Sequence, residues 1–594
     1  MKTRNNIIVF FLILVAMLLS ACGNEPDEDT SKSPIFSIGN IENHLAYAID
    51  MAGALSIERM EQLIDLYYIP SFPSIHITSE LDPFTQPRTY WHDGTVTLSG
   101  AALGFNFEYA DARFRGRGNS TWWRGRDKRP LRVRLRPARP VMSDYEARDW
   151  ILLANQFDRS LLRNYTVLNL GLSLSGLGFT PIPHHVHLYV NGEYMGVYLL
   201  TDERDVGPGR MQLQWNDDPA KSDFFLELDA RAPVTGILDE TYVMVNGLPY
   251  DLRWPGDLTP QHVDYVRNYL TAVSHAIRTQ SFDDILALID LDSFVDFYII
   301  QEFSKDVDAR DLSIFMYIAG TGDERRLFKG PIWDFDLTMG NASYQPMGYG
   351  PEGLYVAVFN YWYRYLMGRP EFFDAVKTRW NEIRHREIAQ AIQQTQATAI
   401  RYRHEFERNF TRHPYLLRGR QQMPTPQDIL EIESFLGNVG HLLNWLEARA
   451  NWLDNFFNGK LPDYDHMWAL VEYQYSTTPI TITVNGVIHE TIIPPIRMHN
   501  RILIALQDLE AIFGFEAEYD AVPTGMIAIQ HGDIYITHQI GDLHVNINGV
   551  KLDFPMPTAL IIRDYVFVPF RAFIEALGYE LDWSNSTRTS NIEI

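Results

Sequence analysis

The chain has 594 residues and a formal net charge of −24, with 51 Lys and Arg against 75 Asp and Glu. This length exceeds what one hydrophobic core usually organises, so two or more domains are expected. A charge this negative argues against nucleic-acid binding by the chain as a whole, and a hydrophobic content of 46% argues against a largely disordered chain.

Residues 1–22 predict an export signal. Lys2 and Arg4 precede a short apolar run, 7–19, and LSAC ends at Cys22, the only cysteine. The run is too short to predict a membrane span. LSAC resembles a bacterial lipobox, which implies acylation of Cys22 and a lipid anchor on the extracytoplasmic face of a cell membrane. The alternative is a secretory signal with an incidental cysteine.

Residues 23–68 predict a polar tether and an N-terminal segment. They begin with GNEPDEDTSKSP, which is rich in charged and small polar residues. Because the chain has a single cysteine, no intramolecular disulfide is available. The exported fold must therefore be stabilised by its core alone.

From residue 69 the chain predicts a β-rich part, because polar residues alternate with apolar or β-branched ones. The clearest segments are SIHITSE, TVTLSG, FNFEYADARFRGRG and PLRVRLR. Residues 158–172 predict a helix, and VHLYVNGEYMGVYLLTDE predicts a hairpin that turns at Asn191 and Gly192. Helical spacing then dominates in 261–279, 282–303 and most of 362–457. A β-rich part followed by a helix-rich part predicts two lobes with a cleft between them.

Residues 478–594 predict a separate small α+β domain with an internal repeat. RILIALQDLEAIFGFEAEYD (501–520) and YVFVPFRAFIEALGYELDW (565–583) each predict a strand, a short helix, a Gly and a second strand, as a β-α-β unit. With VNGV and the closing DWSNSTRTSNIEI, the region resembles the copper amine oxidase N-terminal-like domain. Its histidines form no close-spaced ligand pair, so we expect surface histidines rather than a copper site, and a role in attachment to the cell envelope or in display. They are His489, His499, His531, His538 and His544.

A Gly-rich basic segment, RGRGNSTWWRGRDKRP (115–130), is a candidate nucleotide-binding loop. Backbone amides of such a loop can cradle phosphate, and glycines permit a close approach. Eleven Lys or Arg residues lie between Arg113 and Arg139, which suits phosphate or an acidic protein. An ordinary β-turn and a solvated strand face are the alternatives. The candidate phosphate-binding residues in the loop are Arg115, Gly116, Gly118, Asn119 and Ser120.

Acidic residues in two later segments predict a metal-dependent site. FSKDVDARDLSIFMYI contains Asp308 and, five residues on, Ser313, and GPIWDFDLTMGN contains Asp334 and Asp336. Protein kinases place a base, a metal ligand, a hairpin and a metal-binding Asp in this order. Taken singly, Asp308 fits a turn or helix-cap carboxylate better; its order and spacing with the WDFD segment and the basic Gly-rich loop favour the catalytic interpretation.

Seven motifs together resemble the CotH kinase family, the spore coat protein H-like proteins. They are RGRGNSTW, KRPLRVRL, DRSLLRNY, VNGEYMGVYLLTDE, FFLELD, KDVDARDLSIFMY and GPIWDFDLTMGN. The resemblance covers residues 69–460 and implies an α+β, divergent two-lobed protein-kinase-like fold. It also implies an atypical kinase that uses ATP and Mg²⁺ or Mn²⁺ to phosphorylate serines of a secreted, surface or coat protein, one that we expect to be Ser-rich.

The resemblance implies a role for each acidic residue. Asp308 matches the carboxylate that orients or deprotonates the acceptor hydroxyl. Asp334 matches the metal-binding Asp, and Asp336 is either a second ligand or a structural partner. Ser313 stands at the position of the other metal ligand.

The resemblance also implies a lysine on the nucleotide phosphates. We assign Lys128, which leads into the strand PLRVRLR, with Arg132 and Arg134 as competitors. Glu203, at the end of the hairpin, is expected to pair with that lysine or to form a salt bridge at the hairpin end.

Two residues depart from the family pattern. Asn is frequent where this chain has Asp306, and is more frequent than Ser at the position of Ser313. Asp adds negative charge, and a Ser hydroxyl is a weaker metal ligand than an Asn carbonyl. The alternative is therefore a non-catalytic surface scaffold or adhesin with a kinase-like fold. A metal-dependent hydrolase using Asp334 and Asp336 is a third possibility, weakened by the lack of nearby ligand histidines.

Overall fold

The computed structural model describes most of the chain from residue 71 onward. Cys22, the signal segment and the tether lie outside the described residues, and so does His499. The described part is 71–593 without 102–105, 124–127, 232–241, 344–345, 419–424, 462–470, 473, 476–477, 499–500, 521–524, 541–543, 554–558 and 563–564.

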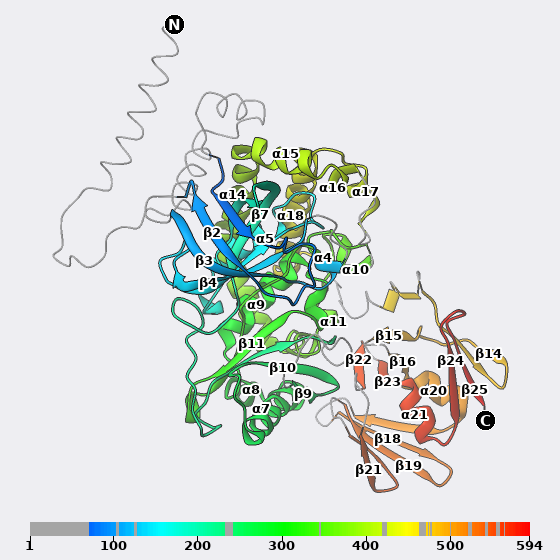
Figure 1. Ribbon diagram of the computed structural model, residues 1–594. Helices are drawn as coiled ribbons and strands as arrows, with labels where there is room; N and C mark the ends of the chain where they lie inside the picture. Colours follow the sequence, from blue (N-terminus) through cyan, green and yellow to red (C-terminus); the bar gives the residue numbers. More distant parts are fainter. Residues whose placement is uncertain are drawn as a thin grey trace. The chain divides into compact units, whose positions relative to one another are not determined.

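Seven strands form a closed barrel in the order β1-β2-β3-β4-β5-β7-β6 (Figure 1). Neighbouring strands are antiparallel, except that β6 returns parallel to β1. The alternating segments of the sequence are confirmed as strands, and their inward side chains form one apolar cluster. From β1 to β7 the bounds are Ser74–Ser79, His92–Ser99, Phe107–Gly116, Leu131–Arg139, Ala147–Leu153, His184–Val190 and Glu193–Asp202.

The predicted hairpin is confirmed as β6 and β7. Asn191 and Gly192 have φ values of 49° and 84°, the left-handed conformations that a tight two-residue hairpin turn requires. The helix expected at 158–172 is shorter, because α5 spans Arg163–Leu172 and the preceding residues form a loop.

A second sheet has five strands in the order β12-β11-β8-β10-β9. Helix α7 (Pro260–Thr279) matches its prediction, whereas the segment 282–303 divides into α8 (Phe282–Leu286) and α9 (Leu291–Ser304). The strands β8, β9, β10, β11 and β12 span Phe224–Leu228, Tyr242–Val245, Leu248–Trp254, Ile314–Ala319 and Arg326–Lys329.

Helices complete this part of the chain and share one large apolar cluster with α5, α9 and the second sheet. The longer ones are α13 (Pro370–Ile383), α14 (Ala389–Arg401), α15 (Arg403–Arg412) and α18 (Phe435–Phe457). The mixture of helices and sheets confirms the α+β class. The closed barrel was not predicted, because no local pattern specifies that β6 pairs with β1. None of the described helices is long and apolar enough to cross a membrane.

The C-terminal residues form a small sheet domain with its own apolar cluster. Its sheets have the orders β14-β13-β25-β24, β15-β16-β23-β22 and β17-β18-β19-β20-β21. The strands β13, β14, β15, β18, β19, β22 and β25 span Thr481–Val484, Val487–His489, Ile496–Met498, Met526–His531, Ile534–Gln539, Leu560–Ile562 and Thr589–Glu593. The repeat is confirmed as β16-α20-β17 and β23-α21-β24, but the two strands of each unit join different sheets, so neither is a β-α-β unit of one sheet. These elements span Arg501–Ala505, Leu506–Phe513, Glu516–Asp520, Tyr565–Pro569, Phe570–Ala576 and Glu580–Ser584.

Candidate functional site

Two acidic loops lie at the same end of the second sheet. Asp308 and Ser313 lie between α9 and β11, and Asp334 and Asp336 follow β12. Because β11 and β12 are antiparallel neighbours, the loop that enters β11 and the loop that leaves β12 share one end of the pair. The fold thus brings together side chains that are about twenty residues apart in the sequence.

Ser313 and Asp334 join the two loops directly. The Ser313 hydroxyl lies 3.4 Å from Oδ2 of Asp334, to which it donates a hydrogen bond. Both residues have positive φ, 52° and 73°, a conformation that is uncommon outside Gly and that concentrates at functional sites. Asp306 organises the first loop, since its Oδ1 accepts a hydrogen bond of 3.0 Å from the Asp308 amide.

The acidic loops are dominated by like charge. Burial raises the pKa of Asp308 to about 7; Asp334 adds to the rise and Arg231 opposes it. Burial, and then the charge of Asp308, raises the pKa of Asp306 well above its usual range. Burial and the charge of Asp334 do the same to Asp336. A bound cation would relieve this repulsion, because an opposite charge favours the ionised carboxylates.

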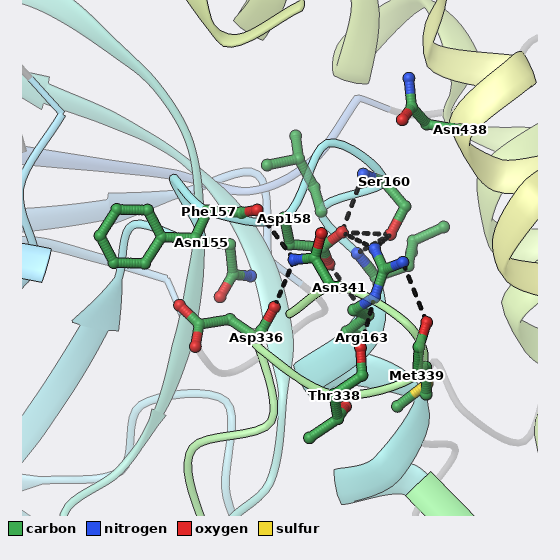
Figure 2. A network of polar contacts seen from close by, with 12 residues as sticks. Asn155, Phe157, Asp158, Ser160, Arg163, Asp336, Thr338, Met339, Asn341 and Asn438 are labelled. Atoms are coloured by element: carbon green, nitrogen blue, oxygen red, sulfur yellow. Dashed lines mark hydrogen bonds and ion pairs between the residues drawn. The ribbon is translucent and has the colours of Figure 1, made fainter. Parts of the chain in front are cut away.

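An ion pair of the DRSLLRNY motif supports the loop after β12, as Figure 2 shows. Arg163 contacts Oδ1 of Asp158 at 2.5 Å and donates hydrogen bonds to the carbonyls of Thr338 (3.0 Å) and Met339 (3.3 Å). The pair is buried. Arg163 thus fixes the backbone that follows the two loop aspartates.

Asn341 and Asn164 complete this support. The Asn341 amide donates to the carbonyls of Asp336 (2.7 Å) and Phe157 (2.9 Å), as Figure 2 shows. The carbonyl oxygen of the Asn164 side chain accepts a hydrogen bond of 2.8 Å from the Phe335 amide, between the two aspartates. Side-chain amides from distant segments therefore satisfy backbone groups that the irregular loop leaves unpaired.

A paired set of cations surrounds Glu203 at the end of β7. Glu203 contacts Arg132 and Arg204, each at 3.3 Å, and Arg132 also pairs with Asp149 at 2.8 Å. Burial opposes ionisation of Glu203, but Arg132, Arg204 and Arg117 outweigh it and hold the pKa of this carboxyl at about 2. Glu203 is therefore ionised, and its charge is compensated.

Lys128 contacts groups other than Glu203. It is fully buried, and its Nζ donates a hydrogen bond of 2.6 Å to the Ala154 carbonyl and lies 5.2 Å from the centre of the Tyr198 ring. Burial lowers its pKa to about 7. The expected pairing of Lys128 with Glu203 is replaced by the pairing of Arg132, because the Arg132 side chain on β4 reaches both Asp149 on β5 and Glu203 after β7.

Arg117 and Arg204 are site residues that the sequence did not identify. Both guanidinium groups lie over the Trp333 ring, at 5.1 and 4.1 Å from its centre. Burial lowers the pKa of Arg117 to about 10, Arg204 adds to the shift, and Glu203 and Asp334 oppose it. Arg117 thus lies within electrostatic reach of both the cations and the acidic loops. The position of Arg117 in the Gly-rich motif could have identified it as a site residue. No sequence pattern pointed to Arg204.

The glycines of the basic loop have local packing roles. A Cβ on Gly116 would lie 2.4 Å from the buried Trp122 ring, and Gly118 has a φ of 75°. The amides of Trp122 and Trp123 donate to the Asn119 carbonyl. These two amides are therefore used in turning the chain into α4 (Ser120–Trp123).

Arg115 extends the paired cations along β3. It lies opposite Arg132 on β4, and its guanidinium is over the Trp91 ring, 4.9 Å from the centre. Burial lowers its pKa, and Arg132 adds to the shift. The structure therefore brings Arg115 toward Arg132 and Glu203, while Gly116, Gly118, Asn119 and Ser120 form the turn that follows.

The acidic loops offer oxygen donors of the kind that Mg²⁺ and Mn²⁺ prefer. In the described part of the chain, no group of three or more His, Cys, Asp or Glu side chains is arranged to hold a metal alone. Mg²⁺ in phosphate-transferring sites is commonly bound by one or two carboxylates together with substrate phosphates. Asp334 and Ser313, which already meet, fit that mode of binding.

Comparison with known families identifies two regions of the chain. A family model described as CotH kinase protein matches residues 112–453. A model described as copper amine oxidase N-terminal domain matches residues 483–592. No curated protein shows significant similarity to the chain. The first match contains both acidic loops and the Glu203 cations, and the second contains the C-terminal repeat.

Proposed function

The chain belongs to the CotH kinase protein family, and from this premise we propose that it is an atypical protein kinase with a two-lobed, kinase-like arrangement. It transfers phosphate from ATP to serines of a secreted or surface protein and uses Mg²⁺ or Mn²⁺. The observation that carries the proposal is the meeting of Ser313 with Asp334 beside the half-buried Asp308. Along the chain, Asp308, Ser313 and Asp334 follow the order of base, metal ligand and metal-binding Asp in kinases.

On the acidic side, Asp308 acts on the acceptor. A carboxylate with a pKa raised to about 7 is basic enough to accept the proton of a seryl hydroxyl near neutral pH. Asp334 and Ser313 would hold the divalent cation, which when bound offsets the negative charge of the phosphate oxygens. Asp336, next to Asp334, would ionise when the cation is bound and add to the negative charge that holds it.

On the cationic side, Arg132 takes the part first assigned to Lys128. Its ion pair with the ionised Glu203 positions a guanidinium that can bind phosphate in a bidentate manner. Arg117, whose guanidinium lies over the Trp333 ring, is the second candidate for binding the phosphates. The charges of both Glu203 and Asp334 act on it, so it is near both charged regions.

We extend the proposal to the place where the reaction occurs. Acylation of Cys22 would tether the kinase to the outer face of the cell membrane, close to exported Ser-rich substrates. Cys22→Ala should release the protein from the membrane fraction or leave an unprocessed precursor. Unchanged fractionation and unchanged mass of the variant would contradict the anchor.

A non-catalytic scaffold is the second candidate, and a specific feature favours it. Ser313 supplies a hydroxyl where the family more often has an amide, and Asp306 adds a buried carboxyl beside Asp308. Both changes weaken or crowd a cation site. In this case the chain would keep the fold and bind partners without transferring phosphate.

One experiment separates the candidates. Purified residues 23–594 are incubated with ATP and Mg²⁺ or Mn²⁺ in the presence of acidic and Ser-rich acceptor proteins, and phosphoserine is measured. The kinase proposal expects incorporation that Asp308→Ala and Asp334→Ala abolish. Equal incorporation in all three proteins, or none in the unmodified protein, would favour the scaffold.

A further inference from the structure

The C-terminal domain contains a pocket of about 590 Å³ that the proposed kinase reaction does not use. It lies among β16, α21, β20, β21 and β24, of which Figure 1 labels β16, α21, β21 and β24. Strand β20 spans His544–Ile547 and β21 spans Val550–Asp553. The volume lies within the range of pockets that bind small ligands, about 300 to 1,000 Å³.

Positive charge is concentrated in this pocket. Three arginines line it, Arg497, Arg501 and Arg571, and all three are exposed. The whole matched stretch, 483–592, holds six Lys and Arg residues against thirteen Asp and Glu. Half of the cations of an acidic domain therefore face one pocket, which favours an anionic ligand over a neutral one.

The acidic residues at the rim do not neutralise this charge. Glu575 pairs with Arg571 at 3.3 Å, but both side chains are about half exposed, and such surface pairs contribute little. Asp553 is directed to His544 at 3.4 Å. Arg571 can therefore exchange its partner for a ligand carboxylate at small cost.

One wall of the pocket is a tryptophan with an ordered amide beside it. Trp583 is half-buried, and its indole N–H donates a hydrogen bond of 2.8 Å to Oδ1 of Asn585. Both residues line the pocket, with the buried side chains of Phe570 and Leu581. A flat aromatic face suits the C–H face of a sugar ring, and the Asn585 amide retains N–H donors for hydroxyls.

We infer that this pocket binds an acidic saccharide, with the sugar ring on Trp583 and its carboxylate on the arginines, foremost Arg501. Guanidinium groups bind carboxylates in a planar, bidentate manner, which explains the arginines. A nucleotide or a polyphosphate would use the cations but would not require the amide beside the ring. The inference concerns residues 483–592 and does not depend on the kinase reaction.

The internal repeat provides matched controls. In the aligned units Trp583 corresponds to Tyr519, which is 38% exposed and does not line the pocket. For charge, Lys551 is an exposed cation on β21 that does not line the pocket either. Tyr519→Ala and Lys551→Gln therefore remove the same kind of group from the same domain.

The test measures binding of an oligogalacturonate to the purified full chain by titration calorimetry, with its neutral methyl ester and inorganic polyphosphate as comparison ligands. Arg501→Gln and Trp583→Ala should each weaken oligogalacturonate binding by about tenfold or more. Tyr519→Ala and Lys551→Gln should leave it unchanged. Because Arg501 is exposed, its variant keeps the fold even if Trp583→Ala does not.

Three results would overturn the inference. Equal binding of the methyl ester would show that the arginines do not read a carboxylate. Polyphosphate binding as tight as oligogalacturonate binding, with no effect of Trp583→Ala in a folded protein, would show a non-selective basic patch. No binding of oligogalacturonate at millimolar concentration would show that the pocket takes no acidic saccharide.

Discussion

The candidate site has two charged regions, the cations around Glu203 and the acidic loops beside β11 and β12. They differ in how far their charges are paired within the protein. Around Glu203, every carboxylate faces guanidinium groups, and the cations stack on aromatic rings. In the loops that flank β11 and β12, buried and half-buried carboxyls repel one another, and the pKa values of Asp306, Asp308 and Asp336 rise. The first region is complete within the protein, whereas the second has negative charge in excess. The difference indicates where a ligand cation would be stabilised most.

Removing a carboxylate from the acidic loops should have the largest effect on phosphoryl transfer. Asp334→Asn should lower metal-dependent phosphoryl transfer by about 10³-fold, because the charge that holds the cation is lost. Thermal stability should stay equal or rise, since repulsion with Asp308 and Asp336 is reduced. Transfer and melting temperature are measured on the same preparation. Asp323→Asn, an exposed acid at the opposite end of β11 and β12, is the control and should change neither.

The next effect concerns the proposed base. Asp308→Asn should lower the transfer rate by about 10²-fold, while ATP binding measured by calorimetry should remain within about twofold of the unmodified protein. A base acts on the acceptor and not on the nucleotide, so the two readouts should separate. Parallel loss of both would mean that Asp308 organises the nucleotide site instead.

The role of the Glu203 region in ATP binding can be tested by replacing one of two nearby cations, Arg132 or Lys128, with Met. Arg132→Met should weaken ATP binding by about tenfold, since one charge-assisted contact contributes about 1.5–3 kcal/mol. Lys128→Met removes a cation of the same strand region and should leave ATP binding within about twofold. Fluorescent-nucleotide displacement measures both. The reverse ranking would return the phosphate role to Lys128.

Lys128 also allows a test by pH. Its pKa falls from an ordinary 10.5 to about 7 in the folded protein. Below pH 7 the folded protein carries a buried charge, which costs up to about 5 kcal/mol; the unfolded chain retains its proton up to about pH 10.5, so the cost disappears as the pH rises from 7 to 10.5. Lys128→Met should therefore stabilise the fold at pH 6, and by less at pH 9.5, in urea unfolding. An equal difference at both values would show that the pKa of Lys128 is not lowered in the folded protein.

Local patterns predicted much of this structure, and long-range pairing escaped them. The hairpin at Asn191 and Gly192, the helix α7 and the two acidic loops followed from turn residues and periodicity. The barrel did not, because the pairing of β6 with β1 spans more than a hundred residues. The expected pairing of Lys128 with Glu203 was wrong for a similar reason: Lys128 precedes β4, and its partners, the Ala154 carbonyl and the Tyr198 ring, come from distant segments that no local pattern specifies.

Removal of the C-terminal domain should have the smallest effect on phosphoryl transfer. This change tests whether the Glu203 region and the acidic loops need any residue of that domain. All buried members of that domain's own apolar cluster lie between Ile482 and Ile592, so it is expected to fold as a unit. A chain that ends at Tyr475 should transfer phosphate at a rate within about twofold of the full protein, which is about 0.4 kcal/mol and typical of independent parts. Transfer is compared at equal concentrations of folded protein, judged by circular dichroism. A tenfold loss in a folded truncated protein would mean that residues beyond Tyr475 contribute to the balance of charge around Asp334 and Glu203.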